Sequence, residues 1–121
     1  MKKIGFVTNN KMLAQSLASV LADGADFSLL VIAKGAQAVL DAEILQPDIA
    51  VVDADSELGT ALHLCGELRR AAPGCRLLFL LSRKSRTDSE IAVAAKKSGR
   101  IDDFLFYDSS LDYLVAKLRS M

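Results

Sequence analysis

The apolar residues of this 121-residue chain alternate between two spacings along its whole length. Short continuous apolar runs are typical of strands buried on both faces, whereas apolar residues that recur every three or four positions are typical of helices. We expect strands at 3–8, 27–33, 48–53, 76–82 and 103–107. We expect helices at about 10–22 and 35–45, from 61 to before Pro73, at 87–98, and over a last stretch that contains 111–118. Each predicted strand is therefore followed by a predicted helix.

This alternation restricts the fold to few topologies. Strands that alternate with helices form a parallel sheet with helices on both faces, a three-layer α/β/α architecture. Because crossover connections are right-handed, we expect a doubly wound five-stranded sheet in the flavodoxin-like order 2-1-3-4-5. The chain has the length of one domain, and no linker, repeat or low-complexity segment divides it. We expect a single domain over residues 1–121.

The spacing of apolar residues also predicts which helix faces meet the core. The predicted core faces are Ala36, Val39, Leu40 and Ile44 in the second helix, and Ile91, Ala94 and Ala95 in the fourth. The fourth helix offers so few apolar residues that we expect it to pack weakly and to be the most mobile of the helices.

The charges of the chain balance, with 15 Lys and Arg residues against 15 Asp and Glu residues. A surface without net charge has no overall field, so we expect neither nucleic acid nor membrane as a direct partner. Two cysteines and one histidine, without a CxxC pair, argue against a structural metal site. No apolar run nears the roughly 18 residues of a membrane span, and the amino end turns polar at Thr8, too early for a signal peptide. We therefore expect a cytoplasmic protein.

Ligands of such sheets bind at the carboxyl ends of the strands, near the point where the strand order reverses. The residues that the predicted strands deliver there are Thr8, Asn9, Asn10, Asp53, Asp55, Ser82 to Arg86, Tyr107 and Asp108. Any chemistry of the domain should involve this set.

Three segments resemble the receiver domains of two-component response regulators, of the chemotaxis-regulator type. Pro47 to Asp53 (PDIAVVD) is similar to the PDLVLLD segment whose last Asp accepts a phosphoryl group, and Asp102 to Leu105 (DDFL) is similar to the segment before a Lys-Pro pair. The segment from Ala33 to Leu40 resembles the start of the second helix of that family. The resemblance covers about the full chain, with one small insertion near Arg100.

Three functional positions of the family are kept. The resemblance implies that Asp53 is the phosphoacceptor equivalent. Ser82 stands at the position of the switch hydroxyl that bonds a bound phosphoryl group, and Phe104 stands at the position of the aromatic rotamer switch.

Other positions depart from the family's pattern. Thr8 and Asn9 stand where the family has its pair of magnesium-binding acids, and Tyr107 stands where it has the phosphate-binding Lys. Magnesium requires hard, charged oxygen ligands, and phosphoryl transfer requires cations around the transferred group. We therefore expect a degenerate receiver that is not an enzyme, has no cofactor, and would bind magnesium only if phosphorylation were retained.

The loop after the fourth predicted strand carries Arg83, Lys84 and Arg86 beside the same rim. One interpretation is that these cations pair with Asp53 or Asp55, or bind an anion. The other, which we favour, is an ordinary solvated loop.

The resulting functional prediction is an atypical receiver that acts in signal transduction as a protein-interaction or dimerisation module. Its partner would be another protein, a fused output domain, or a second copy bound through the last helix–strand–helix surface at about 87–120. A position before a ParA-like pilus-assembly ATPase is one arrangement that fits. The first alternative is a working receiver that a histidine kinase phosphorylates on Asp53. The second is a flavodoxin-like protein that binds an anion or a flavin.

Overall fold

The computed structural model describes residues 2–8, 11–22, 27–32, 36–54, 58–81, 86–106 and 111–121. Its elements are β1 (Lys2–Val7), α1 (Lys11–Ala22), β2 (Phe27–Ile32), α2 (Ala36–Leu45), β3 (Ile49–Asp53), α3 (Leu58–Ala71), β4 (Arg76–Leu81), α4 (Arg86–Lys97), β5 (Asp103–Phe106) and α5 (Leu111–Ser120). The described strands form one sheet in the order β2-β1-β3-β4-β5, and every pairing is parallel. The predicted fold class and strand order are confirmed.

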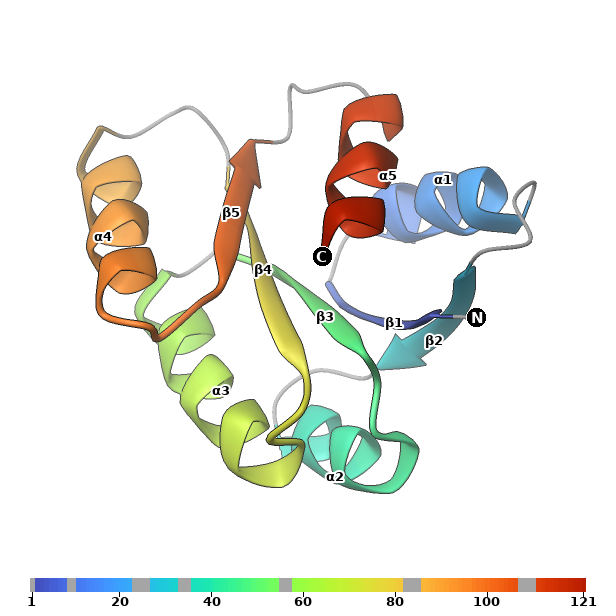
Figure 1. Ribbon diagram of the computed structural model, residues 1–121, viewed down its shortest axis with the longest axis horizontal. Helices are drawn as coiled ribbons and strands as arrows, with labels where there is room; N and C mark the ends of the chain where they lie inside the picture. The colour runs from blue at the N-terminus through green and yellow to red at the C-terminus, as the bar shows by residue number, and fades with distance from the viewer. Residues whose placement is uncertain are drawn as a thin grey trace.

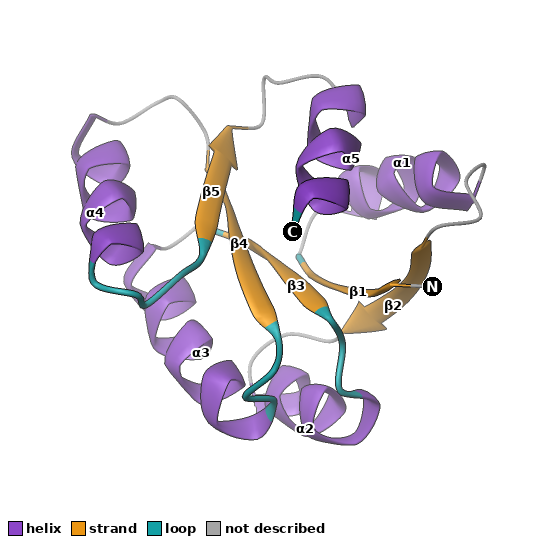
Figure 2. Ribbon diagram, viewed as in Figure 1, coloured by secondary structure: helices purple, strands orange, loops and turns teal. Residues whose placement is uncertain are grey.

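The helices form two layers, one on each face of the sheet (Figure 1). Helices α1 and α5 cover one face, while α2, α3 and α4 cover the other, and Figure 2 shows the strands between these two layers. Because all strands are parallel, their carboxyl ends lie along one edge of the sheet. The register places Val7 beside Val52 and Asp53 beside Leu80 at this edge.

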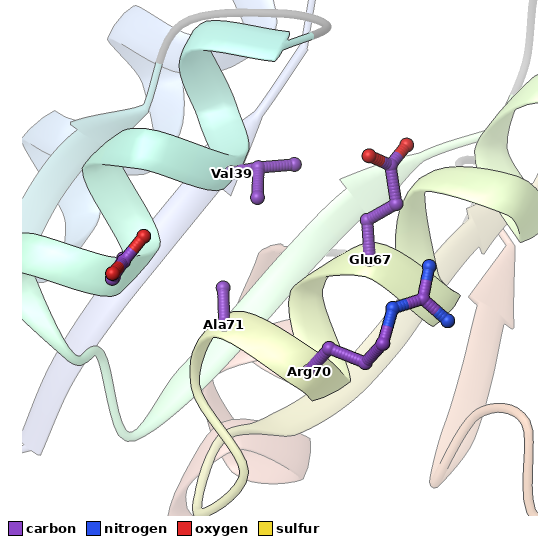
Figure 3. Close-up of a pocket in the computed structure, with 5 residues that line it drawn as sticks. Val39, Glu67, Arg70 and Ala71 are labelled. Carbon is purple, nitrogen blue, oxygen red and sulfur yellow. The ribbon is translucent and has the colours of Figure 1, made fainter.

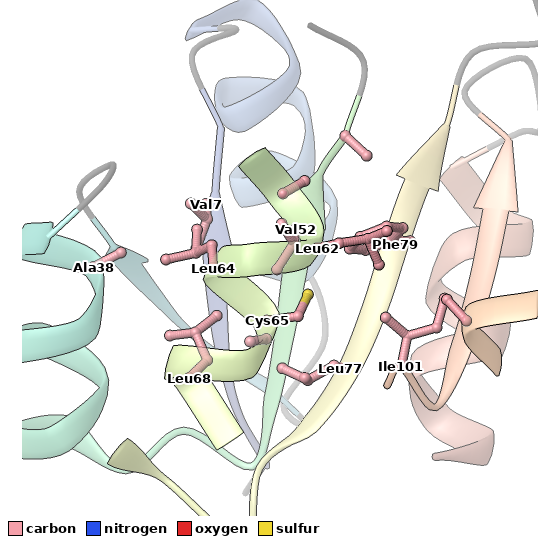
Figure 4. Packing of buried hydrophobic residues seen from close by; sticks show 14 of the residues in the cluster. Val7, Ala38, Val52, Leu62, Leu64, Cys65, Leu68, Leu77, Phe79 and Ile101 are labelled. Carbon is pink, nitrogen blue, oxygen red and sulfur yellow. The ribbon is translucent and has the colours of Figure 1, made fainter. Parts of the chain in front are cut away.

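The central strands explain why their apolar runs are continuous. Successive side chains of a strand point to opposite faces, and here both faces are covered. In β4, Leu77 and Phe79 belong to the core cluster under α3, whereas Leu78 and Leu80 belong to the cluster under α1 and α5. Figure 4 shows the first cluster, where Cys65 of α3 lies over the sheet.

Helix α3 turns an apolar face to the sheet. Its buried residues are Ala61, Leu62, Leu64, Cys65 and Leu68. Cys65 and Cys75 are free thiols, and burial raises their pKa values to about 12 and about 11. Thiols with such high pKa values stay protonated and behave as small apolar side chains.

Helix α2 turns a different face to the core than the one predicted. Ala38 and Ala42 are buried, Val39 is half-buried against the same cluster, and Leu40 and Ile44 are exposed. The prediction was wrong for Leu40 and Ile44 and correct for Val39, because α2 is apolar on most sides, so that a helical spacing fits more than one stripe. Because alanine is small, the stripe of Ala38 and Ala42 allows the helix axis to come close to its neighbours. A stripe with Leu40 and Ile44 would prevent this.

Helix α4 shows a similar difference. Its buried residues are Ala92 and Ala95, whereas Ile91 and Ala94 are exposed. Only Ala95 was assigned to the core correctly. The helix therefore packs through two methyl-sized side chains, and its predicted mobility stays a prediction.

The amino-terminal edge of the sheet is fixed by polar side chains that bond the backbone. Asp48 accepts a hydrogen bond from the Lys3 amide at 2.7 Å, and Asp102 accepts one from the Leu77 amide at 2.7 Å. Gln46 ends α2 with a positive φ of 47°, and its side-chain amide donates to the Ala71 carbonyl at 3.0 Å. This edge lies opposite the carboxyl ends of the strands, so it supports the fold rather than the candidate site. None of the described helices has the length and apolar character that a bilayer crossing requires.

Candidate functional site

The candidate site begins with Asp53, the last residue of β3. The four residues before it in the strand are buried, and Asp53 is half-buried where the strand reaches the edge of the sheet. The ladder continues one residue further, because the Ala54 amide donates to the Leu80 carbonyl at 2.9 Å. Asp53 is therefore held on a rigid backbone with its carboxylate at the rim.

Thr8 meets Asp53 from the neighbouring strand. It directly follows β1, and because Val7 pairs with Val52, Thr8 and Asp53 lie side by side. The Thr8 hydroxyl Oγ1 donates a hydrogen bond to Asp53 Oδ2 at 2.5 Å. Short O–H···O bonds of this kind to a carboxylate are about twice as strong as bonds between neutral groups.

This hydrogen bond bears on whether the site fits magnesium. Magnesium is held by carboxylates and water oxygens in near-octahedral geometry. The described part of the site offers one carboxylate, and the hydroxyl beside it points its hydrogen at that carboxylate instead of offering a second negative charge. Among the described residues, no three His, Cys, Asp or Glu side chains gather into a metal-binding group. The donors at Thr8 and Asp53 therefore fit a magnesium ion poorly.

Phe104 lies in β5, the last strand of the sheet, and β4 separates it from the strand of Asp53. It pairs in register with Phe79 and is half-buried against the core cluster under α3 and α4. Its ring meets the Phe106 ring edge-to-face, with 6.0 Å between centroids and an interplanar angle of 87°. This is a favourable aromatic geometry. The predicted switch role of Phe104 stays a prediction.

Of the predicted cationic loop, the structure describes Arg86. It opens α4 with a side chain that is 94% exposed, and its Nε lies 3.5 Å from Glu90 Oε1 on the next turn. Arg86 therefore pairs within its own helix. The other predicted site residues, Asn9, Asp55, Ser82, Arg83, Lys84 and Tyr107, lie outside the described residues.

An ionic cluster centred on Asp103 joins α4, β5 and α5. Lys96 of α4 lies 3.1 Å from Asp103 Oδ1, and Lys117 of α5 lies 2.8 Å from Asp103 Oδ2. Burial alone would raise the pKa of Asp103, but the hydrogen bonds from Lys117, the Phe104 amide and Lys96 outweigh it and hold the pKa below its usual value. Lys96 and Asp103 are seven positions apart in the sequence, so their pairing is local. The contribution of Lys117 was missed, because no short-range pattern connects it with β5.

Comparison with known proteins identifies the fold. No protein-family model matches the chain, and no curated protein matches it. Among solved structures, the receiver domain of a Francisella response regulator matches with a TM-score of 0.80 and 21% identity, over 99% of this chain and 95% of that one.

Two structures from Burkholderia pseudomallei also match. A response regulator described with a phosphorylated aspartic acid, a calcium ion and citrate has a TM-score of 0.77 and 22% identity, over 96% of this chain and 65% of its own. A putative pilus assembly-related protein has a TM-score of 0.77 and 20% identity, over 99% of this chain and 88% of its own. At these identities the likeness shows that the chain has the receiver fold.

Proposed function

We propose that this chain is a cytoplasmic pseudo-receiver, a signalling domain that binds a protein instead of accepting a phosphoryl group. The observation that carries the proposal is the hydrogen bond from Thr8 Oγ1 to Asp53 Oδ2, at 2.5 Å. In the receiver fold, Thr8 stands where the resembling family has an acid that holds magnesium. A neutral hydroxyl at this position stabilises the Asp53 carboxylate by a direct hydrogen bond and adds no negative charge that could hold a metal.

The chemistry of phosphoryl transfer supports this proposal. For transfer to Asp53, a carboxylate oxygen must attack phosphorus while the bond to the donor breaks, and cations must balance the charge of the equatorial oxygens. The Thr8 hydroxyl, the Asn9 amide and the Tyr107 phenol supply neither a metal site nor a cation at the family's three positions. A phosphoryl group would also have to displace the Thr8 hydrogen bond or share it.

The surface formed by α4, β5 and α5 is the proposed binding face for a protein partner, a fused output domain or a second copy. The Asp103 cluster joins its three elements at 3.1 Å and 2.8 Å, so that they present one continuous surface. Val93 of α4 and Tyr113 of α5 expose apolar area beside it. The matching pilus assembly-related protein is compatible with a role as one module of a larger assembly.

The test is the mass of the intact chain after incubation with acetyl phosphate and Mg²⁺. We expect no phosphoryl adduct on the wild-type chain, as for the Asp53→Asn variant. A triple variant with Thr8→Asp, Asn9→Asp and Tyr107→Lys restores the missing charges and should acquire an adduct. An adduct on the wild-type chain that Asp53→Asn removes would overturn the proposal.

The alternative function is a working phosphoacceptor, and one observation favours it. Asp53 closes β3 at the edge of a receiver fold, and a matching structure of that fold carries a phosphorylated aspartic acid with calcium. The same mass measurement decides between the two functions.

A further inference from the structure

Helix α2 exposes its largest apolar side chains. The side chains of its core face are alanines, whereas Leu40 is 52% exposed, Ile44 is 78% exposed and Leu45 is 37% exposed. Leu40 and Ile44 are four residues apart, so they form one ridge along the outer side of the helix. Contiguous apolar surface of this kind is typical of a binding site.

A groove runs beside this ridge, between α2 and α3 (Figure 3). Its volume is about 310 Å³, and it is lined by Val39, Glu43, Glu67, Arg70 and Ala71. Val39 and Ala71 provide the apolar part of the lining, and Glu67 and Arg70 rise from α3 (Figure 3). Because Val39 and Glu43 each precede a ridge residue by one position, the ridge lies next to the groove on the helix surface.

Two of the three charged residues that line the groove are acidic, Glu43 and Glu67. Helix α2 has no basic residue, and its other acid, Asp41, is not part of the lining. Across the groove, α3 adds Glu67, whose Oε1 lies 3.2 Å from His63 Nε2, and one cation, Arg70. The chain as a whole has no net charge, so this acidic character is local.

These charges indicate which occupant the groove fits. Two copies that packed α2 against α2 would bring their acidic residues together, and like charges across an interface oppose association. A partner with basic residues beside an apolar stripe would instead match both the ridge and the carboxylates of Glu43 and Glu67. An amphipathic helix has the right shape, because helices lay their apolar face into hydrophobic grooves.

We propose that the α2–α3 groove, together with the Leu40–Ile44 ridge, binds an amphipathic helix of a partner protein whose apolar face is flanked by Lys or Arg. This surface is separate from the α4–β5–α5 face, and the proposal does not depend on the loss of phosphorylation. The apolar contact supplies affinity, and the Glu43 and Glu67 carboxylates select the basic flanks.

The first test uses two designed helical peptides of about five turns with the same apolar stripe. One peptide carries Lys and Arg at the flanking positions, and the other carries Glu there. We expect fluorescence anisotropy to show at least about tenfold tighter binding of the basic peptide, with an affinity that falls as salt is added. Equal affinities for the two peptides would overturn the proposal.

The second test locates the bound peptide on the chain. Ile44→Ser removes apolar area at the ridge and should weaken binding of the basic peptide about tenfold. Glu43→Lys should shift the preference toward the acidic peptide. Met12→Ser is the matched control, because Met12 of α1 is an apolar residue as exposed as Ile44, at 78%, and belongs to neither proposed binding face. All three positions are exposed, so the variants should keep the melting temperature of the wild-type chain.

Two outcomes of the second test would overturn the proposal. One is a loss of binding in Met12→Ser that equals the loss in Ile44→Ser. The other is sedimentation that shows a dimer of the wild-type chain and a monomer of Ile44→Ser, since the ridge would then bind a second copy.

Discussion

At the scale of single residues, the account depends on what stands beside Asp53. A strand-end carboxylate next to an acid needs a cation, whereas the same carboxylate next to a hydroxyl is stabilised by a hydrogen bond. In this chain the neighbour is a hydroxyl, because Thr8 Oγ1 donates a hydrogen bond to Asp53 Oδ2 at 2.5 Å. Under the proposed function, this one side chain replaces metal binding at the site by an internal hydrogen bond.

This role of Thr8 predicts the effect of two substitutions on stability. Thr8→Val keeps the shape of the side chain but removes the donor, and we expect the free energy of unfolding at neutral pH to fall by about 1–2 kcal/mol. Thr8→Ser keeps the hydroxyl and should lose much less. Urea denaturation of the three proteins measures the difference. If the Val and Ser variants were equally stable, the hydrogen bond would contribute nothing.

At the scale of secondary-structure elements, the Asp103 cluster joins α4, β5 and α5. Helix α4 buries only two alanines among its described side chains, and the ion pair from Lys96 to Asp103 adds a second contact with the sheet. Lys117 attaches α5 to the same carboxylate. Asp103 therefore connects both helices to β5.

The lowered pKa of Asp103 predicts how this cluster responds to pH. The ionised carboxylate stabilises the folded chain at every pH above its unfolded pKa of about 3.9, and the stabilisation is lost as the pH falls through the lower folded value. Asp103→Asn should therefore cost about 1 kcal/mol at pH 7, since the pairs are partly solvated. The difference from wild type should shrink below about pH 4. Denaturation curves across this range measure it, and a difference independent of pH would contradict the assignment.

The elements also show where prediction from sequence succeeds and fails. The parallel sheet followed from five continuous apolar runs that alternate with helical spacings, and the strand order followed from the right-handed crossovers of such sheets. The core face of α2 could not be predicted, since Ala38 and Leu40 belong to different stripes of a helix that is apolar on most sides. The link from Lys117 to Asp103 depends on how α5 packs beside β5, which no local spacing reveals.

The candidate site was predictable in part for a related reason. The position of Asp53 follows from its place at the end of a buried strand, and its closeness to Thr8 follows from the strand order. That Thr8 donates a hydrogen bond directly to Asp53 was not predicted, because a sequence does not show the rotamer of a hydroxyl side chain.

At the scale of the whole molecule, the receiver fold separates three regions. The Thr8–Asp53 pair lies at the carboxyl edge of the sheet, the Asp103 cluster joins α4, β5 and α5, and the α2–α3 groove lies on the helix layer that also contains α4. In a phosphorylated receiver, chemistry at the first region would control the binding surfaces. Here we expect the binding surfaces to work without that control.

The most direct measurement of this claim is an NMR titration of the chain with Mg²⁺ and beryllofluoride, which imitates a phosphoryl group on aspartate. The account predicts that the amide resonances of Thr8, Ala54 and Leu81 do not move, and that the spectrum of Asp53→Asn responds in the same way. Saturable shifts at these amides in the wild-type chain that are absent in Asp53→Asn would contradict it.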